Sequence, residues 1–523
     1  MKTPNKIINK WNMLLPWWTK FIFLLNVLME DYRSKYLKYK KKYLDVKKIY
    51  DFIIVGGGSA GAVIAARLSE MDGVEILLVE AGPNFKPNEF PDELTDVDSI
   101  GSPNYDWGYE SVEGYIGHAI SMPRARVIGG CSAHNACAAT RATVGNFSKW
   151  SEYVKNWTFE DVLPYYKKME NCNFGSDIFH GRDGPFPIRL HNSTEIISKS
   201  FIDSVMMLGY EYIEDLNNGK YLGVGHTPMN VIDGKRQNTA MVYLTAEVRK
   251  KITIIALAEV DKVIIEGDIA TSVILFNGSV YLAKHEIIIS AGTFGSCEIL
   301  KRSGIGPTKE LKHMGIKLLI DAPVGQTLYD QPFYYNVYKL KDTVNLGEGF
   351  NESALLYWTK DAKELDIFLV AFPDDEERTL TLGIGLMQPK SCGSYTNGRI
   401  DLNYFRENDD MRRMVEAIKL ARKITSMGPL GELILHEIYP GDKVKTDDAL
   451  EKAIVDGIDS FGHPTSTVPM GEVVDEFCMV HGMKNLRVVD ASVFPYPVSC
   501  PPNVTVIMVA EKISDHIKKN LTI

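Results

Sequence analysis

Two histidines stand in stretches whose residue types could support chemistry. His134 belongs to the run GGCSAHN (129–135), in which two glycines and a serine let the backbone approach a bound group closely. An imidazole changes charge near pH ~6.5, so this loop is a candidate site for binding or reaction. His463 stands in FGHPTS (461–466), where the same kind of ring could take a proton from a substrate.

A glycine-rich turn supplies the third signal. We expect residues 52–55 to form an apolar strand, 62–69 a helix and 76–79 a second strand. The turn after the first strand has the pattern G-x-G-x-x-G, carried by Gly56, Gly58 and Gly61, with Ser59 and Ala60 between them. Such glycines let backbone N–H groups and a helix N-terminus face a pyrophosphate. Glu80 follows the second strand, where a carboxylate can bind an adenosine ribose; the motif does not choose between NAD and FAD.

Composition sets limits on the class of protein. A chain of 523 residues favours two domains, and a formal charge of −9 excludes a broad nucleic-acid footprint. The seven cysteines are scattered and lack C-x-x-C spacing, which fits neither a disulfide scaffold nor a zinc site. We therefore expect no metal and a reducing compartment.

The first 49 residues differ from the rest in character. An apolar stretch is too short and interrupted to span a bilayer, and no signal-cleavage pattern follows it. The run KYLKYKKKYL has tyrosines at helical spacing with lysines between them. Two interpretations remain open: a solvated lead-in helix, or a basic arm that meets nucleic acid or another anionic surface. Translation could begin at Met1 or at Met29.

From about Tyr50 the chain resembles the glucose–methanol–choline (GMC) family of flavin oxidoreductases. Two family signatures are matched, ARVIGGCSAHN (125–135) and GTFGSCEILKRSGIG (292–306). Shorter matches follow in family order: HGRDGP (180–185), GQTLYDQP (325–332), FGHPTSTVPMG (461–471), LRVVDASVFP (486–495) and PPNVTVIM (501–508). The resemblance implies FAD as the cofactor and hydride transfer from an alcohol CH–OH group to flavin N5.

The resemblance also implies which residues hold FAD. Besides the glycine turn and Glu80, the matching positions are Ala81, Arg126, Gly129, Gly130, Ser132, His134, Asn135, Ala136, Val260, Asp490, Ala491, Asn503 and Val504. In choline oxidase, which is similar in this loop, the histidine at the His134 position is bonded to the flavin 8-methyl carbon. Carried over, this implies a covalent histidyl link from His134.

His463 matches the family's catalytic histidine, but its companion is missing. The family places His or Asn immediately before the P-N of its last flavin loop, where this chain has Pro501. Proline offers neither a side-chain donor nor a backbone N–H. Ser499 or Cys500 would have to substitute, after a small backbone change.

The substrate side is less informative. Glu352 falls roughly where choline oxidase has an acid, yet Gly462 stands where that enzyme has a tyrosine, so we do not expect choline. The implied partners are a small alcohol, oxygen or another electron acceptor, and a homodimer or larger assembly.

Two functions from different classes remain open. The first is an FAD-dependent alcohol oxidase or dehydrogenase. The second is a flavin-loaded structural protein that assembles, which Pro501 and the basic arm favour. The arm is similar to N-terminal segments of giant DNA virus proteins, which implies a cytoplasmic or virion-associated location.

The expected fold class is α/β (α+β overall), with a Rossmann-like FAD-binding domain and a discontinuous sheet-and-helix substrate domain. We assign 50–149, 220–335 and 460–523 to the FAD domain, and 150–219 and 336–459 to the substrate domain. Further strands are expected at 252–257 and 273–276. A helix at 410–425 should present one apolar face, carrying Met411, Met414, Val415, Ile418, Ala421 and Ile424.

Overall fold

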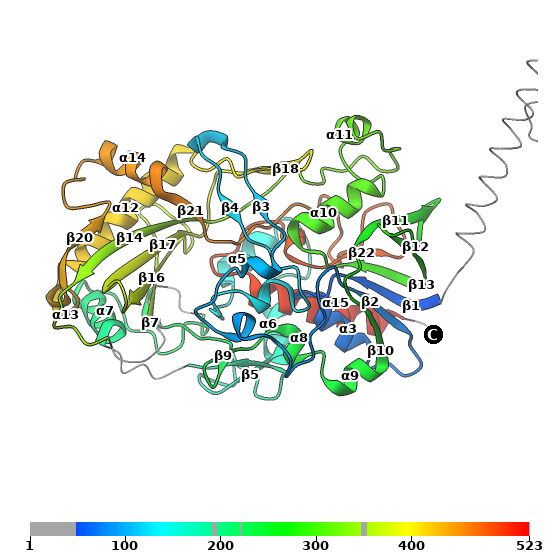
Figure 1. The fold of residues 1–523 in the computed structure, drawn as a ribbon, viewed down its shortest axis with the longest axis horizontal. Helices are drawn as coiled ribbons and strands as arrows, with labels where there is room; N and C mark the ends of the chain where they lie inside the picture. Colours follow the sequence, from blue (N-terminus) through cyan, green and yellow to red (C-terminus); the bar gives the residue numbers. More distant parts are fainter. Residues whose placement is uncertain (1–48, 191–195, 220–221, 347–352, 522–523) are drawn as a thin grey trace, which may run out of the picture.

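Two separate β-sheets form the two ends of the molecule (Figure 1). The structure, a computed structural model, describes residues 49–190, 196–219, 222–346 and 353–521. Residues 1–48 of the lead-in arm and Glu352 lie outside the described residues, whereas Ile49, assigned to the arm, begins the strand β1. Among the helices that are described, none combines the length and apolar composition needed to cross a membrane.

The first sheet is mostly parallel. Its order is β10 (Ile252–Ile255), β2 (Ile76–Val79), β1 (Ile49–Val55), β13 (Val280–Ile289), β12 (Ile269–Leu275) and β11 (Val260–Glu266), with β22 (Leu486–Val488) also on β13. The last two strands on the path, β12 and β11, run antiparallel to their neighbours. All four residues of β2 are buried, as expected for an apolar run with both faces covered.

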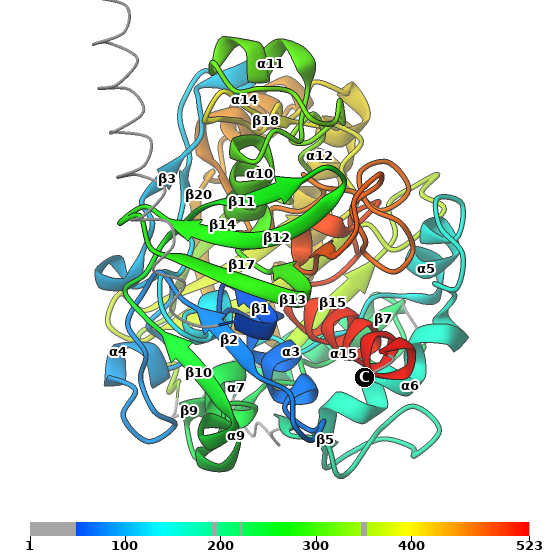
Figure 2. The ribbon, with the colours of Figure 1, turned by 90° about the vertical axis from the view of Figure 1, so that its right-hand side faces the viewer.

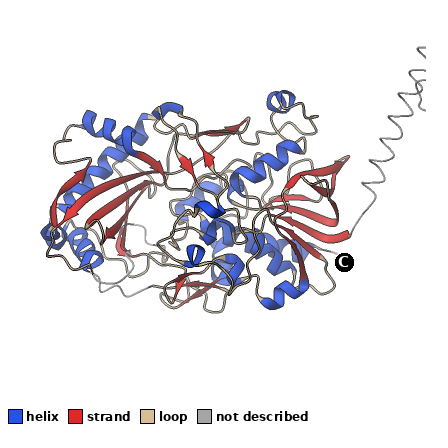
Figure 3. Ribbon diagram, in the orientation of Figure 1, coloured by secondary structure: helices blue, strands red, loops and turns tan. Residues whose placement is uncertain are grey.

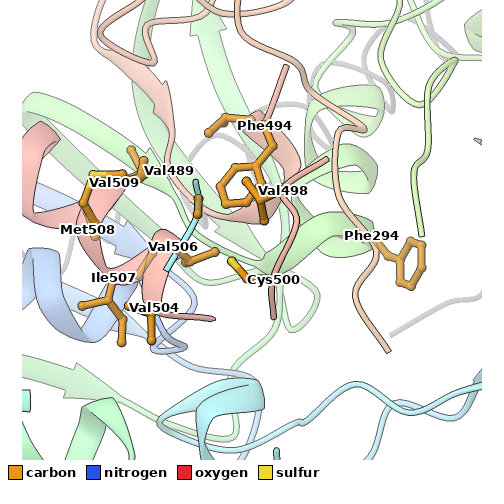
Figure 4. Packing of buried hydrophobic residues seen from close by; sticks show 14 of the residues in the cluster. Phe294, Val489, Phe494, Val498, Cys500, Val504, Val506, Ile507, Met508 and Val509 are labelled. Carbon is orange, nitrogen blue, oxygen red and sulfur yellow. The ribbon is translucent and has the colours of Figure 1, made fainter. Parts of the chain in front are cut away.

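Helices cover this sheet (Figure 2). Helix α3 (Gly61–Leu68) follows β1 and packs against β1, β2 and the C-terminal helix α15 (Asn503–Asn520). Helix α15 also packs against α6 (Phe159–Met169), while α10 (Gly292–Arg302) lies on β11. The apolar side chains of α15, among them Val504, Ile507 and Met508, are buried in the core (Figure 4).

The second sheet is antiparallel throughout. Its order is β20 (Ile434–Tyr439), β14 (Pro332–Leu340), β17 (Thr379–Leu386), β16 (Ile367–Asp374), β15 (Ser353–Tyr357) and β7 (Gly223–His226), with β21 (Ile458–Ser460) also on β14. Helices α7 (Ile196–Met207), α12 (Asn408–Thr425), α13 (Gly428–Leu433) and α14 (Asp447–Gly457) lie beside it (Figure 3). The fold class expected from the sequence is confirmed.

Shorter elements connect the two ends. The remaining helices of the described residues are α4 (Asp92–Thr95), α5 (Val144–Trp150), α8 (Thr239–Val242), α9 (Ala246–Lys251) and α11 (Thr308–His313). The 3-10 turns in the same ranges are η1 (Pro103–Tyr105), η2 (Gly114–Ile116), η3 (Gly130–Ala133) and η4 (Ala491–Val493). Small strand pairs are β3 (Tyr109–Glu110) with β4 (Ser121–Met122), β5 (Glu170–Cys172) with β6 (Phe186–Ile188), β8 (Val231–Ile232) with β9 (Lys235–Arg236), and β18 (Ser394–Thr396) with β19 (Arg399–Asp401).

Several predicted element boundaries need correction. Strand β10 ends at Ile255 and not at Leu257, which has a positive φ of 51° and is exposed. Strand β12 begins at Ile269, four residues before the predicted start, because its alternating burial continues through the β11 hairpin. Helix α12 begins at Asn408, and every predicted face residue is buried except the half-buried Met411.

The domain division stays a prediction, and the strand pairing qualifies it. Strand β7 pairs with β15 in the second sheet, although its residues fall in the segment 220–335 that we assigned to the FAD domain. Helix α6, assigned to the substrate domain, packs against α15 beside the first sheet. The segments around residues 150–230 thus contact both ends of the molecule.

Candidate functional site

The glycine turn lies between β1 and α3, at the carboxyl end of the parallel strands. A Cβ placed on Gly61 would lie 1.9 Å from the carbonyl oxygen of Gly56, so only glycine fits there. Ala60 is the buried residue immediately before α3. The turn therefore brings the start of α3 and its backbone N–H groups against the strand edge, as an anion cradle requires.

Glu80 shapes this turn directly. Its two carboxylate oxygens accept the backbone N–H groups of Gly57, at 2.8 Å, and Gly82, at 2.7 Å. The side chain is buried, and burial raises the pKa of the carboxyl against these hydrogen bonds. Ala81 is half-buried beside it. Besides the predicted ribose contact, Glu80 thus holds two loops in place, a role that the motif did not indicate.

The GGCSAHN loop packs onto the glycine turn. Gly129 donates its N–H to the carbonyl of Gly57 at 2.7 Å. Gly130 has a positive φ of 54°, and a Cβ on it would lie 2.7 Å from Gly58 Cα. Ser132 is fully buried, and its hydroxyl donates to Gly129 O at 2.6 Å. The two small-residue loops, about seventy positions apart in the chain, form one surface.

Arg236, which sequence reasoning missed, fixes the far end of this loop. The side chain is fully buried, and its guanidinium donates to backbone carbonyls on both sides of His134. Its acceptors within 3.0 Å are the carbonyls of Asn135 (2.8 Å), Ser99 (2.8 Å), Leu94 (3.0 Å) and Ala133 (3.0 Å). No local motif marks this arginine, because its partners lie about a hundred positions away.

His134 is buried, and its Nδ1 has no hydrogen-bond partner among the described residues. Its neighbour Cys131 is half-buried. Burial alone would raise the pKa of the Cys131 thiol, but Arg124 and a hydrogen bond with His134 lower it to about 6. Asn135 accepts the Cys137 N–H at 3.1 Å, and Ala136 is exposed. The described part of the chain thus leaves the Nδ1 of this imidazole without a hydrogen-bond partner.

The last predicted loops come to the same place from the other end of the chain. Asn503, at the start of α15, accepts the Ser59 hydroxyl at 2.8 Å, with Val504 buried behind it. The Asp490 carboxylate accepts hydrogen bonds from the Gly292 N–H, at 2.9 Å, and from the hydroxyls of Ser296 and Ser492. It therefore connects the start of α10 to the turn η4, whose first residue is Ala491.

Two predicted residues lie at the rim. Arg126 is exposed, stacks on Trp107 at 4.7 Å and pairs with Glu259 at 3.5 Å. Val260 is the first residue of β11 and is buried. Ala258, two positions earlier, donates its N–H to the Glu80 carbonyl at 3.0 Å. These contacts place both beside the Glu80 end of the turn.

The residues present fit a dinucleotide. Four buried polar atoms in this region lack a partner within the described part of the chain: His134 Nδ1, Asn238 Nδ2, Ser290 Oγ and Asn503 Nδ2. Buried polar atoms without partners cost free energy, so their concentration here indicates a ligand with acceptors and donors of its own. A Cβ placed on Gly56 would lie 2.4 Å from Ser290 O, and one on Gly129 would lie 2.9 Å from Asn238 Oδ1, so both residues lie beside the small-residue loops.

His463 lies on a loop that pairs with the residues just before β14. Its backbone N–H donates to Asp330 Oδ1 at 2.8 Å, and its Nδ1 lies 2.6 Å from Gln331 Oε1. Its ring packs on Phe461 with centroids 4.4 Å apart. Burial, reinforced by the Arg124 guanidinium, lowers the pKa of His463 to about 3. The ring is therefore neutral at neutral pH, with one unprotonated nitrogen.

The residues beside Pro501 do not supply the missing partner. The Ser499 hydroxyl donates to Leu365 O at 2.6 Å and accepts from Asn146 Nδ2 at 3.0 Å, so it is already engaged. Cys500 is buried in the apolar core, where burial raises the pKa of its thiol (Figure 4). The Ser499 hydroxyl is therefore occupied, and the substitution of Ser499 or Cys500 after a small backbone change stays a prediction.

One cluster elsewhere has metal-ligand chemistry. Ligand atoms of Glu170, Cys172 and His180 lie within 4.8 Å of one another. Glu170 Oε1 accepts from Arg141, at 2.5 Å, and lies 3.2 Å from His180 Nδ1, while His180 Nε2 lies 2.9 Å from Asp215. Because these atoms are paired with one another and a guanidinium is present, we interpret the cluster as a buried ion-pair network.

Comparison with known proteins gives the family. GMC oxidoreductase family sequences match residues 50–333 and 390–510. The chain is 32% identical to an oxygen-dependent choline dehydrogenase of Brucella suis biovar 1, over 89% of this chain and 95% of that one. It is 30% identical to the enzyme of the same name from Pectobacterium carotovorum subsp. carotovorum, over 90% and 95%.

Solved structures agree. The crystal structure of pyridoxine 4-oxidase from Mesorbium loti superposes with a TM-score of 0.84 at 28% identity, over 90% of this chain and 100% of that one. A formate oxidase superposes with a TM-score of 0.82 at 26% identity, over 90% and 98%. The glycine cradle, the unpaired polar atoms around it and these matches agree with one another, and the chain belongs to the GMC oxidoreductase family of FAD-dependent enzymes that oxidise alcohols.

Proposed function

We propose that FAD lies on the surface formed by the glycine turn and the GGCSAHN loop, and that His463 is the general base for oxidation of an alcohol. The observation that carries this proposal is that Arg124, directly before the stretch ARVIGGCSAHN (125–135), joins this stretch to the loop of His463. Arg124 donates to the carbonyl of Gly462, next to His463, at 2.7 Å, and its charge also acts on Cys131.

In this reaction the chain's residues handle the proton and the positions of the reactants. Bound FAD supplies the electron-pair acceptor that takes the hydride from the carbinol carbon. His463 accepts the hydroxyl proton, and Asp330 holds its backbone while Gln331 holds its ring. Asn503, Ser290, Asn238 and His134 would satisfy their unpaired atoms against the cofactor. The oxidised product is an aldehyde, a ketone or its hydrate.

We further propose that the free Nδ1 of His134 forms the covalent link to FAD. Support comes from its burial and from the loop anchors on both sides of it, which hold the imidazole in one position. The substrate is a small alcohol, and oxygen or another acceptor completes turnover. The relatives named above are all enzymes, so the alternative of a flavin-loaded assembly or particle protein is not favoured.

The test is anaerobic mixing of the purified yellow protein with a panel of alcohols that includes pyridoxine and choline. We expect loss of flavin absorbance with at least one alcohol, and a loss of about 10²-fold or more in that rate for His463→Ala. His436→Ala is the matched control, because His436 is exposed on β20. A flavin that no alcohol bleaches, or a His463→Ala rate equal to wild type, would contradict the proposal.

A further inference from the structure

The side-chain amide of Gln331 has three hydrogen-bond partners that fix its orientation. Its Nε2 donates to the carbonyls of Met387, at 3.1 Å, and Val498, at 2.7 Å. Its Oε1 lies 2.6 Å from His463 Nδ1. Turning the amide over would place a carbonyl oxygen against two carbonyl oxygens, so the oxygen must face His463.

This orientation decides which imidazole nitrogen carries the proton. An amide oxygen only accepts, so the short contact requires a proton on His463 Nδ1. In a neutral ring the lone pair is then on Nε2. Burial and Arg124 disfavour the doubly protonated ring, so the neutral form with Nδ1–H is the resting state.

The backbone around the pair is held on both sides. Phe461 donates its N–H to Gln331 O at 2.9 Å. The N–H of Tyr329 donates to Thr465 O at 3.2 Å, and the N–H of Thr465 donates to Tyr329 O at 2.8 Å. These bonds continue the β14–β21 pairing, in which Pro332 faces Ser460. Two charged groups face the imidazole. The Arg124 guanidinium donates to the Gly462 carbonyl, and the Asp330 carboxylate accepts the backbone N–H of His463.

We propose that Gln331 is a positioning residue that selects the Nδ1–H tautomer of His463 and so leaves Nε2 as the proton acceptor. This inference rests on the proposed role of His463 as base. The substrate O–H bond breaks, its proton goes to Nε2, and its electron pair forms the carbonyl as the hydride leaves to FAD. The resulting imidazolium keeps its Nδ1–H bond to Gln331 Oε1, which becomes charge-assisted and stronger.

The tautomer can be measured without turnover. In holoenzyme carrying ¹⁵N-labelled histidine, the nitrogen chemical shifts of His463 distinguish protonated from unprotonated positions, with His463→Asn used to assign the signals. We expect wild type to carry the proton on Nδ1, and Gln331→Leu to show a mixture of both tautomers. A wild-type proton on Nε2, or an unchanged tautomer in Gln331→Leu, overturns the proposal.

Rescue by a conservative variant gives a second test that a purely structural role would not move. In Gln331→Glu the carboxyl oxygen that faces the carbonyls of Met387 and Val498 should carry a proton, because burial and these carbonyls disfavour its charged form, and the other oxygen can still accept from Nδ1. This variant should therefore keep the Nδ1–H tautomer and most of the wild-type rate of flavin reduction, and both profiles should be flat between about pH 5 and 8. Gln331→Leu should lose about 10²- to 10⁴-fold in rate at every pH, since a wrong histidine tautomer can cost about 10⁴-fold in kcat.

Gln388→Glu is the matched control. Gln388 donates its Nε2 to Pro497 O at 2.8 Å, so this variant weakens the same loop without touching His463, and it should keep the flat profile. A Gln331→Glu rate as low as that of Gln331→Leu overturns the proposal, as does a Gln388→Glu variant that loses as much rate as Gln331→Leu. If no alcohol reduces the wild-type flavin, the proposed function fails, while the nitrogen shifts still decide the tautomer.

Discussion

Replacing Arg236 by Met should loosen the GGCSAHN loop, because this guanidinium connects the loop to the segment that contains Leu94 and Ser99. Four of its hydrogen bonds, to the carbonyls of Asn135, Ser99, Leu94 and Ala133, are 3.0 Å or shorter. Methionine has a similar length and fills part of the space but donates nothing. Four buried carbonyls would lose their charged donor.

The magnitude follows from these bonds. Each hydrogen bond from a charged donor contributes about 1.5–3 kcal/mol, which sets an upper limit of about 6–12 kcal/mol. Removing the guanidinium also removes the cost of burying it, so we expect a net loss of about 3–5 kcal/mol in the free energy of unfolding. Because two of the bonds flank His134, FAD affinity of a non-covalent form should fall about 10- to 100-fold.

The assay is urea unfolding followed by flavin and tryptophan fluorescence, with FAD titration in the His134→Ala background. Arg249→Met is the control, since Arg249 donates in the same way to Leu244 O and Phe85 O, each at 2.8 Å, away from the loop. If Arg236→Met unfolds within about 1 kcal/mol of wild type, or if Arg249→Met weakens FAD binding equally, the reasoning is refuted.

Three further predictions follow from separate parts of the chain. His134→Ala should fold and bind FAD reversibly, so that acid precipitation releases the colour which stays with the wild-type polypeptide; a wild-type mass equal to the bare chain would exclude the link. The pKa of His180 is raised to about 10, since hydrogen bonds to Asp215, Cys172 and Glu170 outweigh burial, which would lower it. A group whose pKa is higher in the folded than in the unfolded state stabilises the fold at pH values below its unfolded pKa. The free energy of unfolding of wild type should therefore exceed that of His180→Gln by at most about 5 kcal/mol below pH ~6.5, and this excess should be lost as pH rises through about 10. Equal differences at pH 6 and pH 10 would contradict this. Truncation of residues 1–49 should leave flavin content unchanged, and a flavin-free or insoluble product would show that the arm belongs to the core.

Much of the site could be predicted from the sequence because its parts are local. The strand–turn–helix around residues 50–80 depends on the spacing of three glycines and an apolar run, and β2 has the predicted bounds. The GGCSAHN loop and His463 were recognisable by residue type and by family order. Element ends were less accurate, because β12 extends back to Ile269 through its pairing with β11, and α12 begins two residues before the predicted start, at Asn408.

By itself, then, the sequence determined the family, the fold class and the cofactor, and it indicated the loops that we propose form the site. Only the tertiary structure decided which distant groups meet there. Ser59 and Asn503 are 444 positions apart, and Gln331 contacts His463 across 132 positions. Arg236 similarly reaches the loop from a hundred positions away. Short-range patterns reflect backbone geometry and periodic burial, whereas hydrogen bonds between such residues depend on strand order and register, which no single segment encodes.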